Sequence, residues 1–179
     1  MTKINSAGVE LIPFTSLDFR KTLGHFAAGV TTVTMVAKDG SYHGITVSSF
    51  TSVSLNPPLV LICIDKTTAA HTILPEAGAF CVNFLHENQV YLSNRFAGRD
   101  PERSFNDIPT YTAVTGAPVF AESLGFVDCR VVNSYDGGDH TIFLGEVVQL
   151  GVADPVMVDG EELSPLIYYK SKYRFLKPA

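Results

Sequence analysis

The sequence predicts a single, mainly β domain: a closed β-barrel with helices at its periphery. Many runs of β-branched and apolar residues predict strands, and helical patterns occur only in the connections between them. Helices and strands do not alternate regularly, which disfavours a doubly wound sheet. The chain has 179 residues, 46% of them hydrophobic and 17% charged, as is typical of a globular domain with a substantial core.

The first predicted helix covers residues 16–28. Ser16 is a candidate N-cap, and Phe19, Leu23 and Phe26 follow at helical spacing. Gly29 marks its end.

Strands rich in β-branched or other apolar residues are predicted next, at Val30–Ala37, Tyr42–Ser49, Leu59–Asp65 and Ala79–Leu85. Asp39 and Gly40 form a tight-turn signal between the first two. Shorter helices are expected at Ala69–Glu76 and Glu87–Phe96. The C-terminal part predicts a long hairpin and two short strands, at Phe126–Tyr135, Thr141–Gly151, Leu166–Lys170 and Tyr173–Leu176.

Charge and cysteine content limit the class of protein. A net charge of −5 and a pI of about 5.4 argue against nucleic-acid binding, which needs a surplus of Lys and Arg. The polar N-terminus does not have the pattern of a signal peptide, and no apolar run is long enough to span a membrane. Cys63, Cys81 and Cys129 lie far apart in apolar runs, which predicts buried free thiols in a reducing compartment, by default the cytoplasm.

A hydroxyl-rich segment at residues 44–58 is the strongest candidate for a binding site. It contains no charged side chain and carries hydroxyls at Thr46, Ser48, Ser49, Thr51, Ser52 and Ser54. Short hydroxyls and free backbone N–H groups suit a phosphate ester where strand pairing ends. A Ser/Thr-rich hairpin without a ligand is the alternative for the segment taken alone.

Several nucleotide, metal and nucleophile motifs are absent from the sequence. It contains no GxGxxG after the first strand, no GxxxxGK[ST], no HExxH, no GxSxG and no paired CxxC. A Rossmann or P-loop phosphate site is therefore not predicted, and no metal site is expected.

Several stretches in this order resemble the flavin reductases, and more narrowly the small reductase components of two-component flavin-dependent monooxygenases. The stretches are FRKTLGHFAAGVTTVT, DGSYHGITVSSFTSVSLNPPLVLICID, GAFCVNFL, RFAG, CRV, GGDHTIFLGEV and PLIYY. Together they run from Phe19 to Tyr173. The resemblance implies an FMN-binding split β-barrel, and a homodimer with flavin sites near the subunit interface. It also implies hydride transfer from NADH or NADPH to FMN or FAD, with reduced flavin passing to an oxygenase.

The resemblance also assigns residues to the flavin site. It implies that Thr46, Ser48 and Ser49 contact the ribityl chain and phosphate, and that Ser52, Val53 and Ser54 lie along the isoalloxazine ring. It places Asn83 facing the flavin and Arg95 near a phosphate. Lys66 directly follows the predicted strand over residues 59–65, where a phosphate contact is also expected. His140, after the Gly-Gly turn, is expected to position the nicotinamide.

The residues themselves leave other roles open. Asn83 could be a strand amide bonded to a neighbouring loop. Arg95 and Arg99 could be solvated cations near a helix C-terminus. His140 could be a strand-entry residue bonded to Asp139.

The sequence thus predicts a cytoplasmic NAD(P)H:flavin oxidoreductase. The alternatives are a non-catalytic flavin- or haem-binding split barrel, and a self-contained flavin enzyme acting on a bound organic substrate. Residues 1–15 are expected to form an N-terminal extension and residues 16–179 the single domain. No membrane or nucleic-acid partner is expected.

Overall fold

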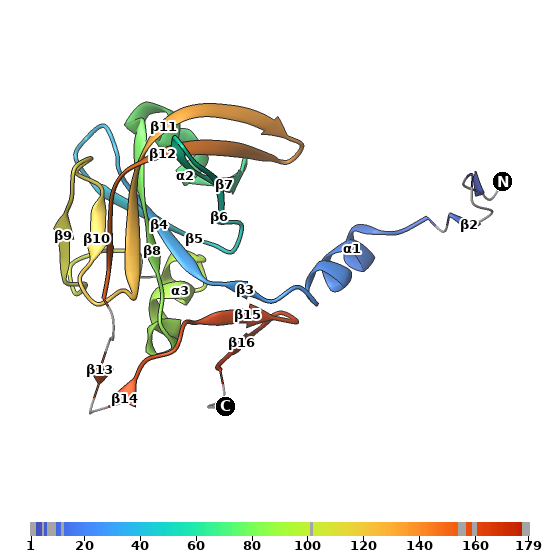
Figure 1. The fold of residues 1–179 in the computed structure, drawn as a ribbon. Coiled ribbons are helices and arrows are strands. Elements are labelled where there is room, and N and C mark those ends of the chain that lie inside the picture. Colours follow the sequence, from blue (N-terminus) through green and yellow to red (C-terminus); the bar gives the residue numbers. More distant parts are fainter. Residues whose placement is uncertain are drawn as a thin grey trace.

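The structure is a computed structural model that describes residues 3–4, 6, 10–11, 13–100, 102–153, 157–158 and 161–176. It consists of a β body with short helices against it and an N-terminal helix that projects from the body (Figure 1). The predicted extension, residues 1–15, lies partly outside the described residues. Within the described part, no helix is long and apolar enough to cross a membrane.

The body is built on a seven-stranded antiparallel sheet with the order β5-β4-β8-β11-β12-β7-β6. Its strands are β4 (Thr31–Val36), β5 (Tyr42–Val47), β6 (Thr51–Leu55), β7 (Pro58–Asp65), β8 (Ala79–Phe84), β11 (Gly125–Gly137) and β12 (His140–Val152).

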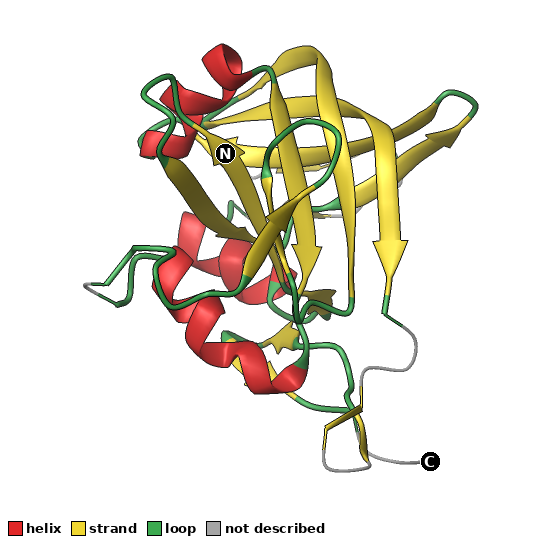
Figure 2. Cartoon of the chain, turned by 90° about the vertical axis from the view of Figure 1, so that its left-hand side faces the viewer, coloured by secondary structure: helices red, strands yellow, loops and turns green. Residues whose placement is uncertain are grey.

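The two edge strands of this sheet, β5 and β6, follow each other in the chain and are joined by residues 48–50. The sheet curls (Figure 2), and β5 also contacts β7. This is the architecture of a split barrel, and the prediction of a mainly β fold with peripheral helices is confirmed. The strand pairing leaves β5 and β6 as edges, so the sheet is not closed by hydrogen bonds as in the predicted closed barrel.

The interior of the curled sheet is filled by apolar side chains that alternate along the strands. Ile62 and Ile64 on β7 are buried, while their neighbours in the strand are half-buried. Helix α2 (Ala69–Ala77) covers one opening with Ala70 and Leu74. Helix α3 (Val90–Phe96) follows the 3-10 turn η1 (Glu87–Gln89). Its residues Leu92 and Phe96 are buried in a second hydrophobic cluster.

Short strands complete the molecule. A three-stranded sheet joins β3 (Ala28–Gly29), β15 (Ile167–Tyr169) and β16 (Lys172–Arg174). Two-stranded ladders are formed by β1 (Lys3–Ile4) with β2 (Glu10–Leu11), β9 (Thr110–Thr112) with β10 (Pro118–Phe120), and β13 (Met157–Val158) with β14 (Glu161–Glu162).

Helix α1 (Ser16–Leu23) is shorter than the predicted helix over residues 16–28. Its N-cap is Thr15 instead of Ser16, and Thr15 forms a capping box with Asp18. Gly24 caps the C-terminus, and Ala28 and Gly29 pair with β15 instead of continuing the helix. The apolar spacing that predicted the longer helix includes Phe26, which lies beyond the cap and is exposed.

The predicted strand over residues 42–49 ends earlier, at Val47. Residues 48–50 leave the ladder, and the chain then forms β6, which the sequence analysis did not identify as a separate strand. The hydroxyl-rich segment is therefore divided between an edge strand, a connection and the opposite edge strand.

The three cysteines are free thiols, as predicted. Cys81 and Cys129 are buried, and burial raises the pKa of the Cys129 thiol to about 12. Cys63 is only half-buried, in contrast to the prediction.

Candidate functional site

A cavity of about 690 Å³ lies beside edge strand β5 and the connection that follows it. The ends of β7 and α3, the start of α2 and the start of β12 also reach this cavity. Its polar lining residues are His43, Thr46, Ser48, Ser49, Cys63, Asp65, Thr67, Thr68, Arg103 and His140. A volume of this size is within the usual range for small-molecule and cofactor sites.

Close packing of β5 against α3 forms part of the wall. A Cβ atom on Gly44 would lie 2.6 Å from Cδ1 of Phe96, so only glycine permits this approach. Because β5 is an edge strand, its outer backbone N–H groups have no partner strand in the sheet, and residues of β5 line the cavity.

Thr46, Ser48 and Ser49, which were predicted to contact a flavin, line the cavity together, but two of their hydroxyls have local partners. Thr46 Oγ1 donates to the carbonyl of Ser93 at 2.8 Å. Ser49 Oγ donates to the carbonyl of Cys63 at 3.1 Å and accepts from the Cys63 N–H at 3.0 Å. Ser49 thereby fastens the connection to β7, while Ser48 is exposed.

Ser52, Val53 and Ser54 lie on β6 and are not among the residues that line the cavity. Ser54 Oγ accepts from the N–H of Asn56 at 3.3 Å. Val53 is 49% exposed and Leu55 is 95% exposed on the same edge strand. Within this chain, the structure does not bring this part of the hydroxyl-rich segment to the cavity.

His140 lines the cavity at the tip of the β11–β12 hairpin. Its Nδ1 atom lies 2.7 Å from Oδ1 of Asp139, and it pairs across the ladder with Asp65. The pKa of Asp65 is lowered mainly by hydrogen bonds from the backbone and hydroxyl of Thr67, and the nearby His140 contributes less. The imidazole therefore lies on a wall that also carries a carboxylate.

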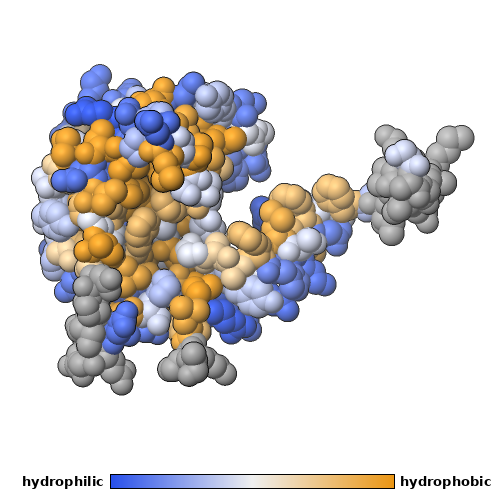
Figure 3. Space-filling view, viewed as in Figure 1, coloured by the Kyte–Doolittle hydropathy of each residue, from blue (hydrophilic) through white to orange (hydrophobic). Residues whose placement is uncertain are grey.

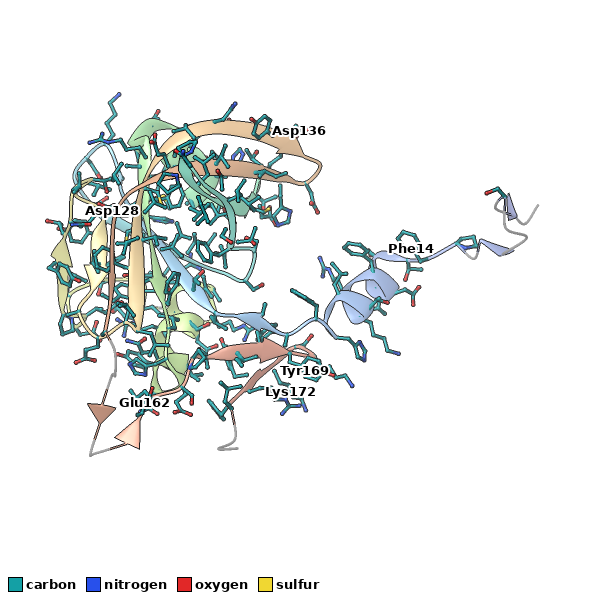
Figure 4. The ribbon with its side chains drawn as sticks, in the orientation of Figure 1. Phe14, Asp128, Asp136, Glu162, Tyr169 and Lys172 are labelled. Atoms are coloured by element: carbon teal, nitrogen blue, oxygen red, sulfur yellow. The ribbon has the colours of Figure 1, made fainter. Side chains whose placement is uncertain are left out.

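Lys66 does not line the cavity and instead holds the hairpin tip. Its ammonium group forms an ion pair with Asp136 and donates to the carbonyl of Gly138 at 2.6 Å. Asp136 lies in the projecting hairpin (Figure 4). Lys66 thus stabilises the hairpin turn that precedes His140.

Asn83 is fully buried and lies away from the cavity lining. Its Nδ2 atom donates to the carbonyl of Thr32 at 3.2 Å and to Oγ1 of Thr34 at 3.1 Å. Its Oδ1 atom accepts from the N–H of Phe120 at 2.8 Å. The amide therefore joins β4, β8 and β10, which is the alternative that the sequence left open, and it does not face the cavity.

Arg95 is also removed from the cavity. Its guanidinium forms a two-point ion pair with Asp107, with Nη2 2.9 Å from Oδ2, and this bond raises the pKa of Arg95. The pair ties α3 to the loop that follows it. Arg99 instead lines a smaller hollow of about 170 Å³, together with Thr46, Ser48 and Tyr168.

The structure adds residues that sequence reasoning did not select. Arg103 and His43 line the cavity from the loop after α3 and from β5, and Asp65 lines it from the end of β7. Arg103 lies outside the stretches that resemble the family, and His43 lies within one of them but has no role assigned by it. Tertiary packing brings these residues to the cavity, so their spacing along the chain could not predict that they line it.

The chemical character of the cavity suits an organic ligand that carries a phosphate. Edge N–H groups and Ser48 are available as donors, Arg103 adds a positive charge, and His140 lies on another part of the wall. The residues present therefore fit a flavin with a nicotinamide nucleotide beside it.

Comparison with known proteins agrees with this geometry. The family model for the flavin reductase like domain matches residues 23–177. The flavin-dependent monooxygenase reductase subunit HsaB of Rhodococcus jostii is 37% identical over 160 residues, covering 89% of this chain and 77% of the relative. The FMN reductase (NADH) SmoA of Agrobacterium fabrum is 40% identical over 139 residues, covering 78% of each chain.

Solved structures show the same relationship. The NADH:FAD oxidoreductase SgcE6 of Streptomyces globisporus superposes with a TM-score of 0.82 at 32% identity, and the match covers 95% of this chain and 99% of that one. Sequence, fold and cavity agree: this chain belongs to the flavin reductase family.

Proposed function

We propose that the protein transfers hydride from NADH or NADPH to FMN or FAD and supplies the reduced flavin to an oxygenase. The single observation that carries this proposal is the cavity of about 690 Å³ between β5 and the hairpin tip, within a fold of the flavin reductase family. Relatives named as an FMN reductase (NADH) and as a reductase subunit of a flavin-dependent monooxygenase support the cofactors and the partner.

When bound, the flavin supplies the hydride-accepting ring, so the chain itself has to bind and orient its two ligands. The outward N–H groups of β5 and the hydroxyl of Ser48 are placed to bind the flavin. His140, held by Asp139 and by the Lys66-supported turn, is placed to position the nicotinamide. No proton donor is required for transfer between the rings, so His140 is assigned as a positioning residue.

The activity is tested with purified protein and all four combinations of FMN or FAD with NADH or NADPH. We expect flavin-dependent loss of the near-ultraviolet absorbance of the reduced nicotinamide, and the combinations identify the preferred pair. Rates no faster than those without protein, for every combination, would contradict the reductase function. Stoichiometric retention of a flavin or haem without nucleotide oxidation would favour a binding module.

We also propose that the protein is a homodimer. Helix α1 has no buried residue, and it projects from the side of the body where β6 and the hairpin tip lie (Figure 1). Its apolar side chains form an exposed surface (Figure 3). Leu17 is 73% exposed and Leu23 is 54% exposed. A second copy that covers α1 and the exposed Leu55 would remove this apolar surface from water.

A cytoplasmic location is part of the proposal. Three free thiols are typical of a reducing compartment.

A further inference from the structure

The cations around the main cavity differ in whether a carboxylate neutralises them. Lys66 is paired with Asp136 and Arg95 with Asp107. Among the described residues, no ion pair involves Arg103, and it is the guanidinium that lines the main cavity. Its positive charge is therefore available to a ligand.

The hydroxyls of Thr46, Ser48 and Ser49 cannot by themselves supply all the hydrogen bonds and the positive charge that a phosphate requires. A hydroxyl has one hydrogen to donate, and Thr46 and Ser49 donate theirs to the carbonyls of Ser93 and Cys63. A phosphate monoester at neutral pH accepts hydrogen bonds and carries close to two negative charges. Ser48 and the edge N–H groups remain as neutral donors, so a nearby cation has a large effect on affinity.

Arg103 lies close to the turn that follows α3, at the cavity wall. Gly98 has φ +72°, and a Cβ atom there would lie 2.9 Å from Nη2 of Arg103. The guanidinium therefore lies over the turn after α3. Burial and the positive charge of Arg103 both lower the pKa of His43, which lines the same cavity.

The wall that contains His140 has the opposite electrostatic character. Asp65 lines it, and hydrogen bonds from Thr67 lower the pKa of its carboxyl, so this group is anionic at neutral pH. A phosphate placed there would be repelled, whereas one placed at Arg103 would be attracted. The two parts of the cavity thus separate phosphate binding from nicotinamide positioning.

We propose that Arg103 binds the phosphate of the flavin and makes the site select FMN and FAD over riboflavin, which lacks that phosphate. The assignment rests on the proposed function, and it adds a specificity-determining residue to the site.

The test compares the binding of riboflavin, FMN and FAD by quenching of flavin fluorescence. Wild type, Arg103→Gln, Arg103→Lys and the control Arg130→Gln are each titrated with the three flavins. Arg130 is exposed on β11 and lines neither cavity, so it controls for the loss of a surface charge. Because Arg103 is exposed, its variants are expected to melt at the wild-type temperature.

For Arg103→Gln we expect dissociation constants for FMN and FAD about tenfold higher, with less than a twofold change for riboflavin. Arg103→Lys should retain much of the preference, and Arg130→Gln all of it. Equal weakening of FMN and riboflavin would overturn the assignment, as would unchanged flavin binding with a raised KM for NADH. A wild-type protein that binds none of the flavins overturns the proposed function itself, together with this assignment.

Discussion

At the scale of single residues, His140 shows how a small polar group is placed by its surroundings. The turn before it is held by Lys66, and its imidazole is held by Asp139. These contacts present the imidazole at the cavity wall, where it can orient a ring without taking part in proton transfer. Its effect should therefore be on the binding of the nucleotide.

We expect His140→Ala to raise the KM for NADH about fivefold while the KM for the flavin changes less than twofold. A single lost contact of about 1 kcal/mol corresponds to a change of this size. Steady-state kinetics with each ligand varied in turn measures both values, and His140→Gln serves as the conservative variant. Small and equal changes in both KM values would give His140 a structural role only.

Asn83 illustrates a residue whose role depends on its partners in the core. Its amide bonds to β4 and to Phe120 on β10, and each partner is buried. We expect Asn83→Ala to lower the free energy of unfolding by about 1–3 kcal/mol for each buried group left unpaired. Below the melting transition, the KM for the flavin should remain unchanged.

Denaturant unfolding of Asn83→Ala measures this loss, and Asn133→Ala is a matched control because Asn133 is exposed on β11. If Asn83→Ala retained wild-type stability but bound flavin more weakly, Asn83 would belong to the ligand site.

At the scale of elements, the connection between β5 and β6 determines the site. The two strands are the opposite edges of the sheet, so residues 48–50 connect one edge to the other across the opening of the split barrel. Ser49 fastens this crossing to β7, and Gly44 allows β5 to approach α3. An edge strand normally risks pairing with other chains, but here residues of β5 line the proposed ligand cavity.

At the scale of the whole molecule, α1 is the part that the single chain leaves unpacked. Its capping box specifies a helix, yet none of its residues is buried. Phe14, labelled in Figure 4, lies at the outer end of this helix and is 73% exposed. In solution, a second copy is expected to cover this surface.

We expect the double variant Phe19→Asp, Leu23→Asp to elute as a monomer, because charges at a buried interface would oppose association. Light scattering coupled to size-exclusion chromatography measures the mass, and Lys21→Ser on the same helix is the control. A wild-type protein with monomer mass would contradict the homodimer. A dimeric double variant would instead exclude α1 from the interface.

The sequence by itself determined the mainly β class and most strand positions, because apolar and β-branched residues recur with the period of a strand. It also identified Thr46, Ser48, Ser49 and His140, which line one cavity. Only the tertiary structure decided that Asn83 and Arg95 have partners within the fold and that Arg103 lines the cavity with no carboxylate partner among the described residues. The physical reason is that hydrogen bonding and charge compensation depend on neighbours distant in sequence, whereas strand periodicity is local.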